Sequence, residues 1–349
     1  MLTTTQELIQ YLHPEEKNRN FSVLNAMVHT ILSCGSEADA QALLPYYLLQ
    51  PGNLDHAQIL PVLMQYGNTG MAQKIYQAVT QHHRLKEGVD ETVLQLFGKL
   101  KYEPARPLLI YYALEQEPYQ YYLSQHAVLG LLHFNLTDLK PLIKSKIEKC
   151  YGQSLFPEFV PALVCKLDAP EQQDVLQKLY ELGENTASTD CMGGIVLGFS
   201  LCGDAGVPYF WKVLFNPNWE LGMSSTGARN YTYKAIQNLQ ITFRELYQKV
   251  KSIEDIEAQR YALDILLEML EIKATKPLAE NTPETITDIL TLLYGWKTAT
   301  ESDNITDLAE KLEKSEEASR IESLLEQKLK EEMLYHNYLS LKKNASSTS

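Results

Sequence analysis

The sequence predicts an all-α protein of stacked helical hairpins, an α-solenoid, with a helical cap or extension at its C-terminal end. Three observations lead to this fold class. Apolar residues recur three and four positions apart, which places them on one face of a helix. Alternating stretches bounded by Asn-Gly or Asp-Gly turns are missing, so a sheet has little support. One short pattern also returns at a regular spacing, which is typical of repeat architectures.

The helical periodicity is clearest after residue 250. One stretch places its apolar residues on a single helix face: Ala258, Tyr261, Ala262, Ile265, Leu266, Met269 and Leu270. A second helix is expected around Ile286 to Leu293, because Thr282 suits an N-cap and Pro283 suits the first helical position. Both stretches predict amphipathic helices.

The repeated pattern is an apolar helix, a short polar turn, and a proline early in a second apolar helix. It occurs in three segments, Leu94 to Leu114, Val128 to Ile147 and Ile195 to Leu214. Their prolines are Pro107, Pro141 and Pro208, separated by 34 and 67 residues, or about one and two units. The same register places Gln73 at the proline position of an earlier unit and centres a missing copy near Val175. The alternative is an irregular helical bundle whose prolines happen to be evenly spaced.

The stretch GFSLCGDAGVPYFWKVL, from Gly198 to Leu214, resembles the second half of a HEAT repeat. In such a repeat an apolar helix ends at a Gly-Asp turn and the next helix begins near Val-Pro. The resemblance covers residues 20 to 215 as degenerate units, and it implies an architecture in which neighbouring helix pairs bury each other's apolar faces. Glycines inside or beside this unit indicate close helix contact or a tight bend: Gly193, Gly194, Gly198, Gly203 and Gly206.

Composition divides the chain into regions. Residues 1–250 form the expected repeat array, interrupted at 215–230 by a segment rich in Pro, Asn, Ser and Gly. Residues 251–343 carry 20 acidic and 12 basic side chains and form an acidic helical region, whose last helix is a candidate for self-association. Residues 344–349 are expected to be a disordered tail.

Charge and hydropathy narrow the function classes. The net charge is -13, so the summed field repels nucleic acid and anionic membrane surfaces, and neither is an expected partner. We see no secretory signal and no apolar run near the roughly 20 residues that cross a bilayer. The five cysteines form no CxxC pair and are read as reduced thiols. We therefore expect a cytoplasmic protein.

Residues with chemistry are sparse, and the sequence predicts no catalytic, cofactor-binding or metal-binding residue. The neighbours His82 and His83 would diverge by about 100° on a helix and are read as a solvated helix end. His126 and His133 are seven residues apart with Asp138 nearby, whereas helical metal ligands usually sit three or four apart. We expect no cofactor.

Tyrosine is the one unusual residue, with 21 copies that often occur in pairs. Adjacent residues on a helix cannot both face the core, so one of each pair is expected at an exposed or groove-lining edge, where tyrosine suits protein contacts. The bland reading is that these rings bridge neighbouring repeats. The predicted partner-binding residues are Tyr111, Tyr112, Tyr121, Tyr122, Trp219, Arg229, Tyr231 and Tyr233.

The repeat pattern without site chemistry predicts a non-catalytic scaffold or regulator that holds a protein partner on a helical-repeat surface. One version, suggested by the acidity, is an immunity-type inhibitor of a basic partner. The alternative is an enzyme on a HEAT-like scaffold, such as a bilin lyase, since a helical-repeat architecture does not exclude catalysis.

Overall fold

The chain is mostly helical in a computed structural model, which describes residues 1–13, 20–150, 159–185 and 192–214, and single positions between 216 and 262. The all-α class is confirmed, because strands in this part of the chain are confined to one hairpin. Residues Met1–Leu142 belong to one compact unit, unit 1, and the described residues from Ile143 onward belong to another, unit 2.

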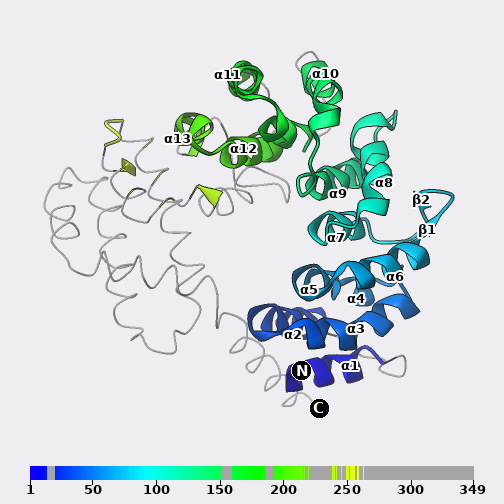
Figure 1. Ribbon diagram of the computed structural model, residues 1–349. Coiled ribbons are helices and arrows are strands. Elements are labelled where there is room, and N and C mark those ends of the chain that lie inside the picture. Colours follow the sequence, from blue (N-terminus) through cyan, green and yellow to red (C-terminus); the bar gives the residue numbers. More distant parts are fainter. Residues whose placement is uncertain are drawn as a thin grey trace, which may run out of the picture. The chain divides into compact units, whose positions relative to one another are not determined.

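Unit 1 holds most of the described elements (Figure 1). In chain order these are α1 (Thr3–Tyr11), α2 (Phe21–Cys34), α3 (Glu37–Leu49), α4 (Leu54–Ala57), α5 (Leu60–Tyr66), α6 (Thr69–Val79), β1 (Thr80–Gln81), β2 (Arg84–Leu85), α7 (Val93–Lys99), η1 (Glu103–Ala105), α8 (Arg106–Ile110), η2 (Tyr111–Glu115), α9 (Tyr121–Leu131) and η3 (Thr137–Leu139). Helix α10 (Lys140–Cys150) contains the point in the sequence where unit 1 ends. Unit 2 continues with η4 (Val160–Lys166), α11 (Ala169–Asn185), α12 (Met192–Leu201), η6 (Gly203–Ala205) and α13 (Val207–Leu214).

The predicted prolines stand where the pattern places them. Pro107, Pro141 and Pro208 are each the second residue of a helix, α8, α10 and α13. A first-turn residue has no helical partner for its amide, so proline is tolerated there.

Two other positions of the predicted register are wrong. Helix α6 begins at Thr69, before Gln73, and α11 begins at Ala169, so Pro170 rather than Val175 is its early residue. The units therefore vary in length by several residues, which a fixed spacing of 34 cannot follow.

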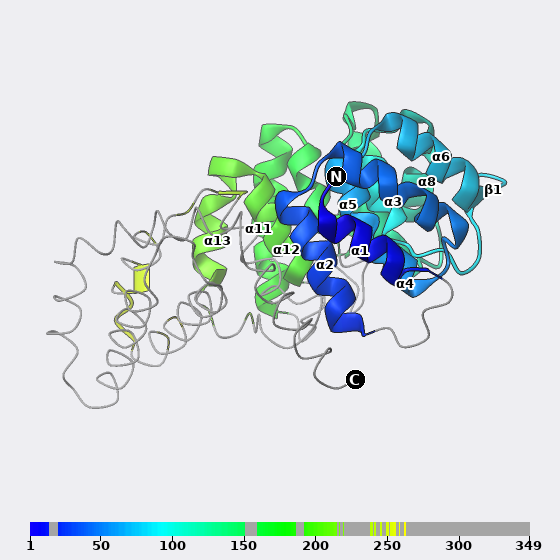
Figure 2. The same ribbon diagram turned by 90° about the horizontal axis from the view of Figure 1, so that it is seen from below.

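Within each unit, helices contact one another in chain order. In unit 1, α2 contacts α5, α5 contacts α7 and α7 contacts α9, while α1 contacts α3 and α3 contacts α6. In unit 2, η4 contacts α12 and α11 contacts α13. The ordered succession of unit 1 can be followed by colour from α1 to α9 in Figures 1 and 2.

Glycines set the closest of these contacts. A Cβ on Gly98 of α7 would overlap the backbone of Gly130 on α9, so the two backbones touch with no side chain between them. In unit 2 a Cβ on Gly198 of α12 would lie 3.0 Å from the carbonyl oxygen of Pro161 on η4. The close helix contact predicted for Gly198 is confirmed.

Side-chain hydrogen bonds tie residues that are about one repeat apart in sequence. Asp39 accepts from Thr5 Oγ1 at 2.6 Å and from the backbone amide of Leu2 at 2.7 Å, although Thr5 is 34 residues away. The Tyr66 hydroxyl donates to the carbonyl oxygen of Leu32 at 2.6 Å, again across 34 residues. Such bonds supplement apolar burial between neighbouring helix pairs.

Several sequence predictions lie outside the described residues. These are the C-terminal helical region at 251–343 apart from a few single positions, its self-associating helix, the tail at 344–349, and the insertion at 215–230 apart from Asn216 and Trp219. The boundary predicted at residue 250 stays a prediction. Among the described helices, none has the length and apolar character that crossing a membrane requires.

Candidate functional site

A hairpin between α6 and α7 departs from the predicted all-helical pattern. Strands β1 and β2 pair antiparallel, Thr80 with Leu85 and Gln81 with Arg84. The turn between them consists of His82 and His83, whose φ angles are 50° and 58°. The reading of these histidines as a helix end is therefore wrong. Figures 1 and 2 both show the hairpin projecting from the helices of unit 1.

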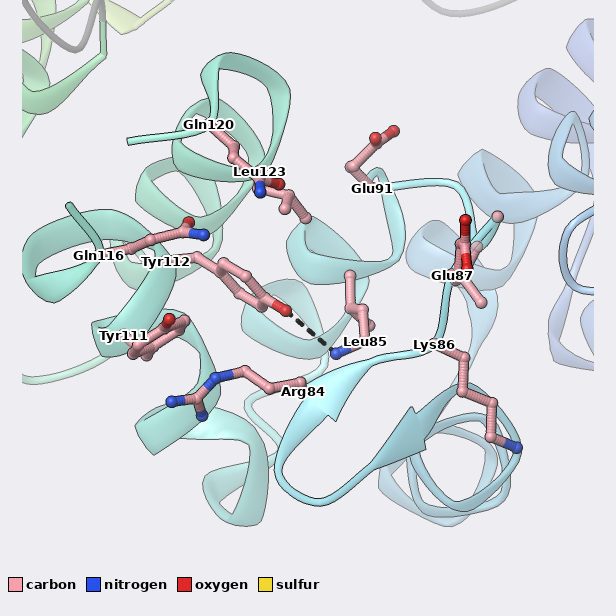
Figure 3. Close-up of a pocket in the computed structure, with 12 residues that line it drawn as sticks. Arg84, Leu85, Lys86, Glu87, Glu91, Tyr111, Tyr112, Gln116, Gln120 and Leu123 are labelled. Atoms are coloured by element: carbon pink, nitrogen blue, oxygen red, sulfur yellow. Dashed lines mark hydrogen bonds between the residues drawn. The ribbon is translucent and has the colours of Figure 1, made fainter. Parts of the chain in front are cut away.

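A pocket of about 460 Å³ lies beside this hairpin (Figure 3). Its walls come from three places: β2 with the segment after it, the end of η2, and the first turn of α9. The residues that matter below are Arg84, Glu91, Tyr111, Tyr112, Gln116 and Leu123. Residues about 40 positions apart thus meet at one site.

Arg84 enters the site already oriented. Its guanidinium lies over the Tyr111 ring, 3.3 Å from the centroid, and its Nη1 donates to the backbone oxygen of His83 at 2.8 Å. Stacking on an aromatic face holds the planar group in place and leaves its edge available to an acceptor. Arg106 of the same unit is instead paired with Asp138 at 2.5 Å, whereas Arg84 has no carboxylate partner among the described residues.

Tyr112 contributes a hydroxyl group. Its oxygen accepts a hydrogen bond from the amide of Leu85 at 3.1 Å, which ties η2 to the hairpin (Figure 3). Burial raises the pKa of Tyr112 above its ordinary value, against the opposing effects of the Leu85 amide and the Arg84 charge. The group therefore stays protonated at neutral pH, and its O–H can donate to another molecule.

Gln116 has an unsatisfied amide oxygen. Helix α8 continues into η2, a π-helical turn whose bond from the Gln116 amide to the Tyr111 oxygen spans 2.8 Å. This turn directs the Gln116 side chain into the pocket (Figure 3). The Oε1 atom is buried and has no hydrogen-bond partner. A buried acceptor without a donor costs about 1 to 3 kcal/mol, so a bound group that supplies a donor is favoured.

Tyr121 and Tyr122 begin α9, between the pocket-lining residues Gln120 and Leu123. Their rings form an edge-to-face pair with centroids 5.0 Å apart, and 61% of Tyr122 is exposed. Tyr111 is half-buried and Tyr112 is buried. The structure thus gathers four of the eight predicted partner-binding residues at or beside one pocket.

The other four predicted residues are not at this pocket. Trp219 is fully buried; its ring stacks on Tyr180 with centroids 6.0 Å apart, and its indole N–H donates to Glu184. Arg229, Tyr231 and Tyr233 lie outside the described residues. Trp219 therefore contacts the chain's own core in unit 2.

The histidine group considered from sequence is divided between different partners. His126 Nδ1 is hydrogen-bonded to the Gln95 amide, and burial lowers its pKa to about 4, so the ring is neutral near pH 7. Asp138 pairs with Arg106. Within the described ranges, His, Cys, Asp and Glu side chains form no group of three or more that could hold a metal ion.

Sequence reasoning did not identify two residues of this site. Arg84 was passed over because the hairpin was not predicted, and Gln116 carries no local signal, since its role depends on the π turn before it. A scan of protein-family models and searches of curated proteins and of solved structures return no match to this chain.

Proposed function

We propose that the chain is a non-catalytic protein-binding scaffold or regulator, that its helix pairs form a HEAT-like repeat array, and that unit 1 carries a partner surface. We call this the hairpin-edge surface and define it as Arg84, Tyr111, Tyr112, Gln116, Tyr121 and Tyr122. The ordered contacts between successive helices support the repeat part of the proposal.

The observation that carries the binding function is the convergence of a stacked arginine and two tyrosine pairs around one pocket. Arginine and tyrosine are the residues that most often dominate protein interfaces, and here they are already ordered. Because Arg84 is stacked and Tyr121 is paired with Tyr122, a partner would immobilise few further side chains. The pocket has room for one or two side chains of a partner.

The net charge of -13 favours a basic partner, which includes the immunity-type inhibitor suggested by the sequence. Long-range attraction to such a partner is screened within about 10 Å at 0.1 M salt, so its association is expected to slow as salt rises. Local contacts at the hairpin-edge surface would depend less on salt.

Site-specific photo-crosslinking in the native host tests the proposal. A photoreactive phenylalanine replaces Tyr122, which is 61% exposed, and in a matched control replaces Phe21, an exposed aromatic of α2 with 57% exposure. We expect one defined adduct from position 122, absent from position 21 and weakened by Arg84→Met in the same chain.

Two outcomes would contradict the proposal. One is the same set of adducts at both positions, which indicates random collisions. The other is no adduct at 122 in cells that contain the folded protein.

A further inference from the structure

We infer that the pocket beside the hairpin is a receptor for a carboxamide group, supplied by an Asn or Gln side chain or by a peptide bond of the bound partner. This inference rests on the proposed function and adds the chemistry of the group recognised. Charge, hydrogen-bonding capacity and shape each support it.

The charges lining the pocket balance. Arg84 and Lys86 are positive, and Glu87 and Glu91 are negative. The Lys86 ammonium donates to the carbonyl oxygen of Ala78 at 2.5 Å, so the hairpin itself engages it. A carboxylate would gain from Arg84 but would meet both glutamates, and a cation would meet Arg84. A neutral ligand avoids both penalties.

The hydrogen-bonding groups require a ligand with a donor and an acceptor. Gln116 Oε1 is a buried acceptor without a partner. The free edge of Arg84 and the Tyr112 hydroxyl are donors. A carboxylate has no donor for Gln116, and an ammonium group has no acceptor for Arg84, whereas a carboxamide has both.

The fit does not depend on which way the Gln116 amide is turned. Turning it by 180° exchanges its oxygen for its NH₂, and the site then asks for a second acceptor lone pair instead of a donor. A carboxamide oxygen has two lone pairs, so the same ligand satisfies either orientation. The apolar walls, Leu85 and Leu123, suit the short methylene stem of Asn or Gln.

Capped tripeptides test the inference on the full-length chain. The probes are acetyl-Ala-Xaa-Ala N-methylamides with Asn, Gln, Asp, Lys or Ala at the centre, and ligand-observed NMR titration gives their relative affinities. We expect the Asn or Gln probe to bind more tightly than the Asp and Lys probes. Equal binding of the Ala and Asn probes identifies the peptide bond as the source of the amide.

Matched variants locate the binding. Gln116→Met keeps the side-chain length but removes the amide, and loss of one such hydrogen bond is expected to weaken the Asn probe roughly three- to tenfold. Gln41→Met, at an exposed glutamine of α3 outside the pocket, is the control and should leave binding unchanged. Circular dichroism melting establishes that both variants are folded.

The result that overturns the inference is tighter binding of the Asp or Lys probe, binding of no probe, or binding of the Asn probe unaffected by Gln116→Met in a folded protein. The photo-crosslink at position 122 separates this failure from failure of the proposed function. An adduct without probe binding removes the carboxamide alone. Probe binding without an adduct removes the protein partner and keeps the carboxamide receptor.

Discussion

Units 1 and 2 use glycine at a helix contact in the same way but with different tolerance. In unit 1, Gly98 of α7 meets Gly130 of α9 backbone against backbone, and an added methyl group would overlap main-chain atoms that cannot turn aside. In unit 2, Gly198 of α12 faces Pro161 and Val164 of η4 at 3.0 and 3.1 Å, which a small shift can relieve. The same Gly→Ala change is therefore expected to have unequal costs, which the predictions below measure.

Gly98→Ala should have the largest effect. Alanine gains up to about 1 kcal/mol of helix propensity over glycine, but the overlap with Gly130 forces α7 and α9 apart, and we expect a net loss of about 3 kcal/mol or more. All three tryptophans, Trp211, Trp219 and Trp296, lie after residue 142. Denaturant unfolding followed by circular dichroism should therefore shift, while the tryptophan fluorescence transition stays in place. A wild-type circular dichroism transition would show that α7 and α9 are not in this contact.

Asp39→Asn should have the second largest effect, because Asp39 is buried and its carboxylate joins α1 to α3. It accepts hydrogen bonds from Thr5, from the Leu2 amide, and from the amide and hydroxyl of Ser36. Asparagine places an NH₂ group against donors, so we expect a loss of about 2 kcal/mol at neutral pH.

The cost of Asp39→Asn should also depend on pH. Burial alone would raise the pKa of Asp39, but the hydrogen bonds from Thr5, Leu2 and Ser36 outweigh it and hold the pKa below its ordinary value of 3.8. A lowered folded-state pKa stabilises the fold above the unfolded value and loses that effect as pH falls through the folded value. The difference in unfolding free energy between wild type and variant should shrink below pH 3.8. A difference that is constant from pH 7 to pH 3 would contradict this account.

The hairpin is a feature of unit 1 without a counterpart in the described part of unit 2. Its two turn residues, His82 and His83, both have positive φ, a conformation that asparagine and glycine adopt more easily. The double variant His82→Asn with His83→Gly should therefore stabilise unit 1 by about 1 kcal/mol. Urea unfolding followed by circular dichroism measures this gain. A less stable variant would mean that the imidazoles make stabilising contacts outside the turn.

Gly198→Ala should have the smallest effect. The gain of about 1 kcal/mol in helix propensity nearly offsets the strain of moving Val164 and the Pro161 carbonyl by a few tenths of an ångström, so the net change should stay below about 1 kcal/mol. Tryptophan fluorescence monitors it in unit 2. A loss as large as that of Gly98→Ala would show that the two contacts are equally tight.

The sequence predicted the repeated helix pairs better than their register. The early prolines of α8, α10 and α13 were located because a proline in the first turn is a fixed local signal. The starts of α6 and α11 were misplaced because turn lengths between helices differ, and Gln73 has no such signal. The hairpin was missed because its turn is His-His rather than Asn-Gly, so its positive φ angles depend on the surroundings and not on residue type.

The candidate site was only half predictable. The tyrosine pairs were visible as pairs, and the expectation that one of each pair reaches an edge fits the exposed Tyr122 and the pocket-lining Tyr111. Arg84 and Gln116 acquire their roles from contacts across 27 residues or more and from a π turn, which composition and periodicity do not encode.

The central structural claim is that each helix is held by its neighbours about one repeat away and not by remote parts of the chain. Hydrogen exchange of wild type and Gly98→Ala, resolved by peptide, tests it most directly. We predict faster exchange in Val93–Lys99 and Tyr121–Leu131, with wild-type rates in Val160–Lys166 and Met192–Leu201. Equal acceleration in all four segments would contradict the claim.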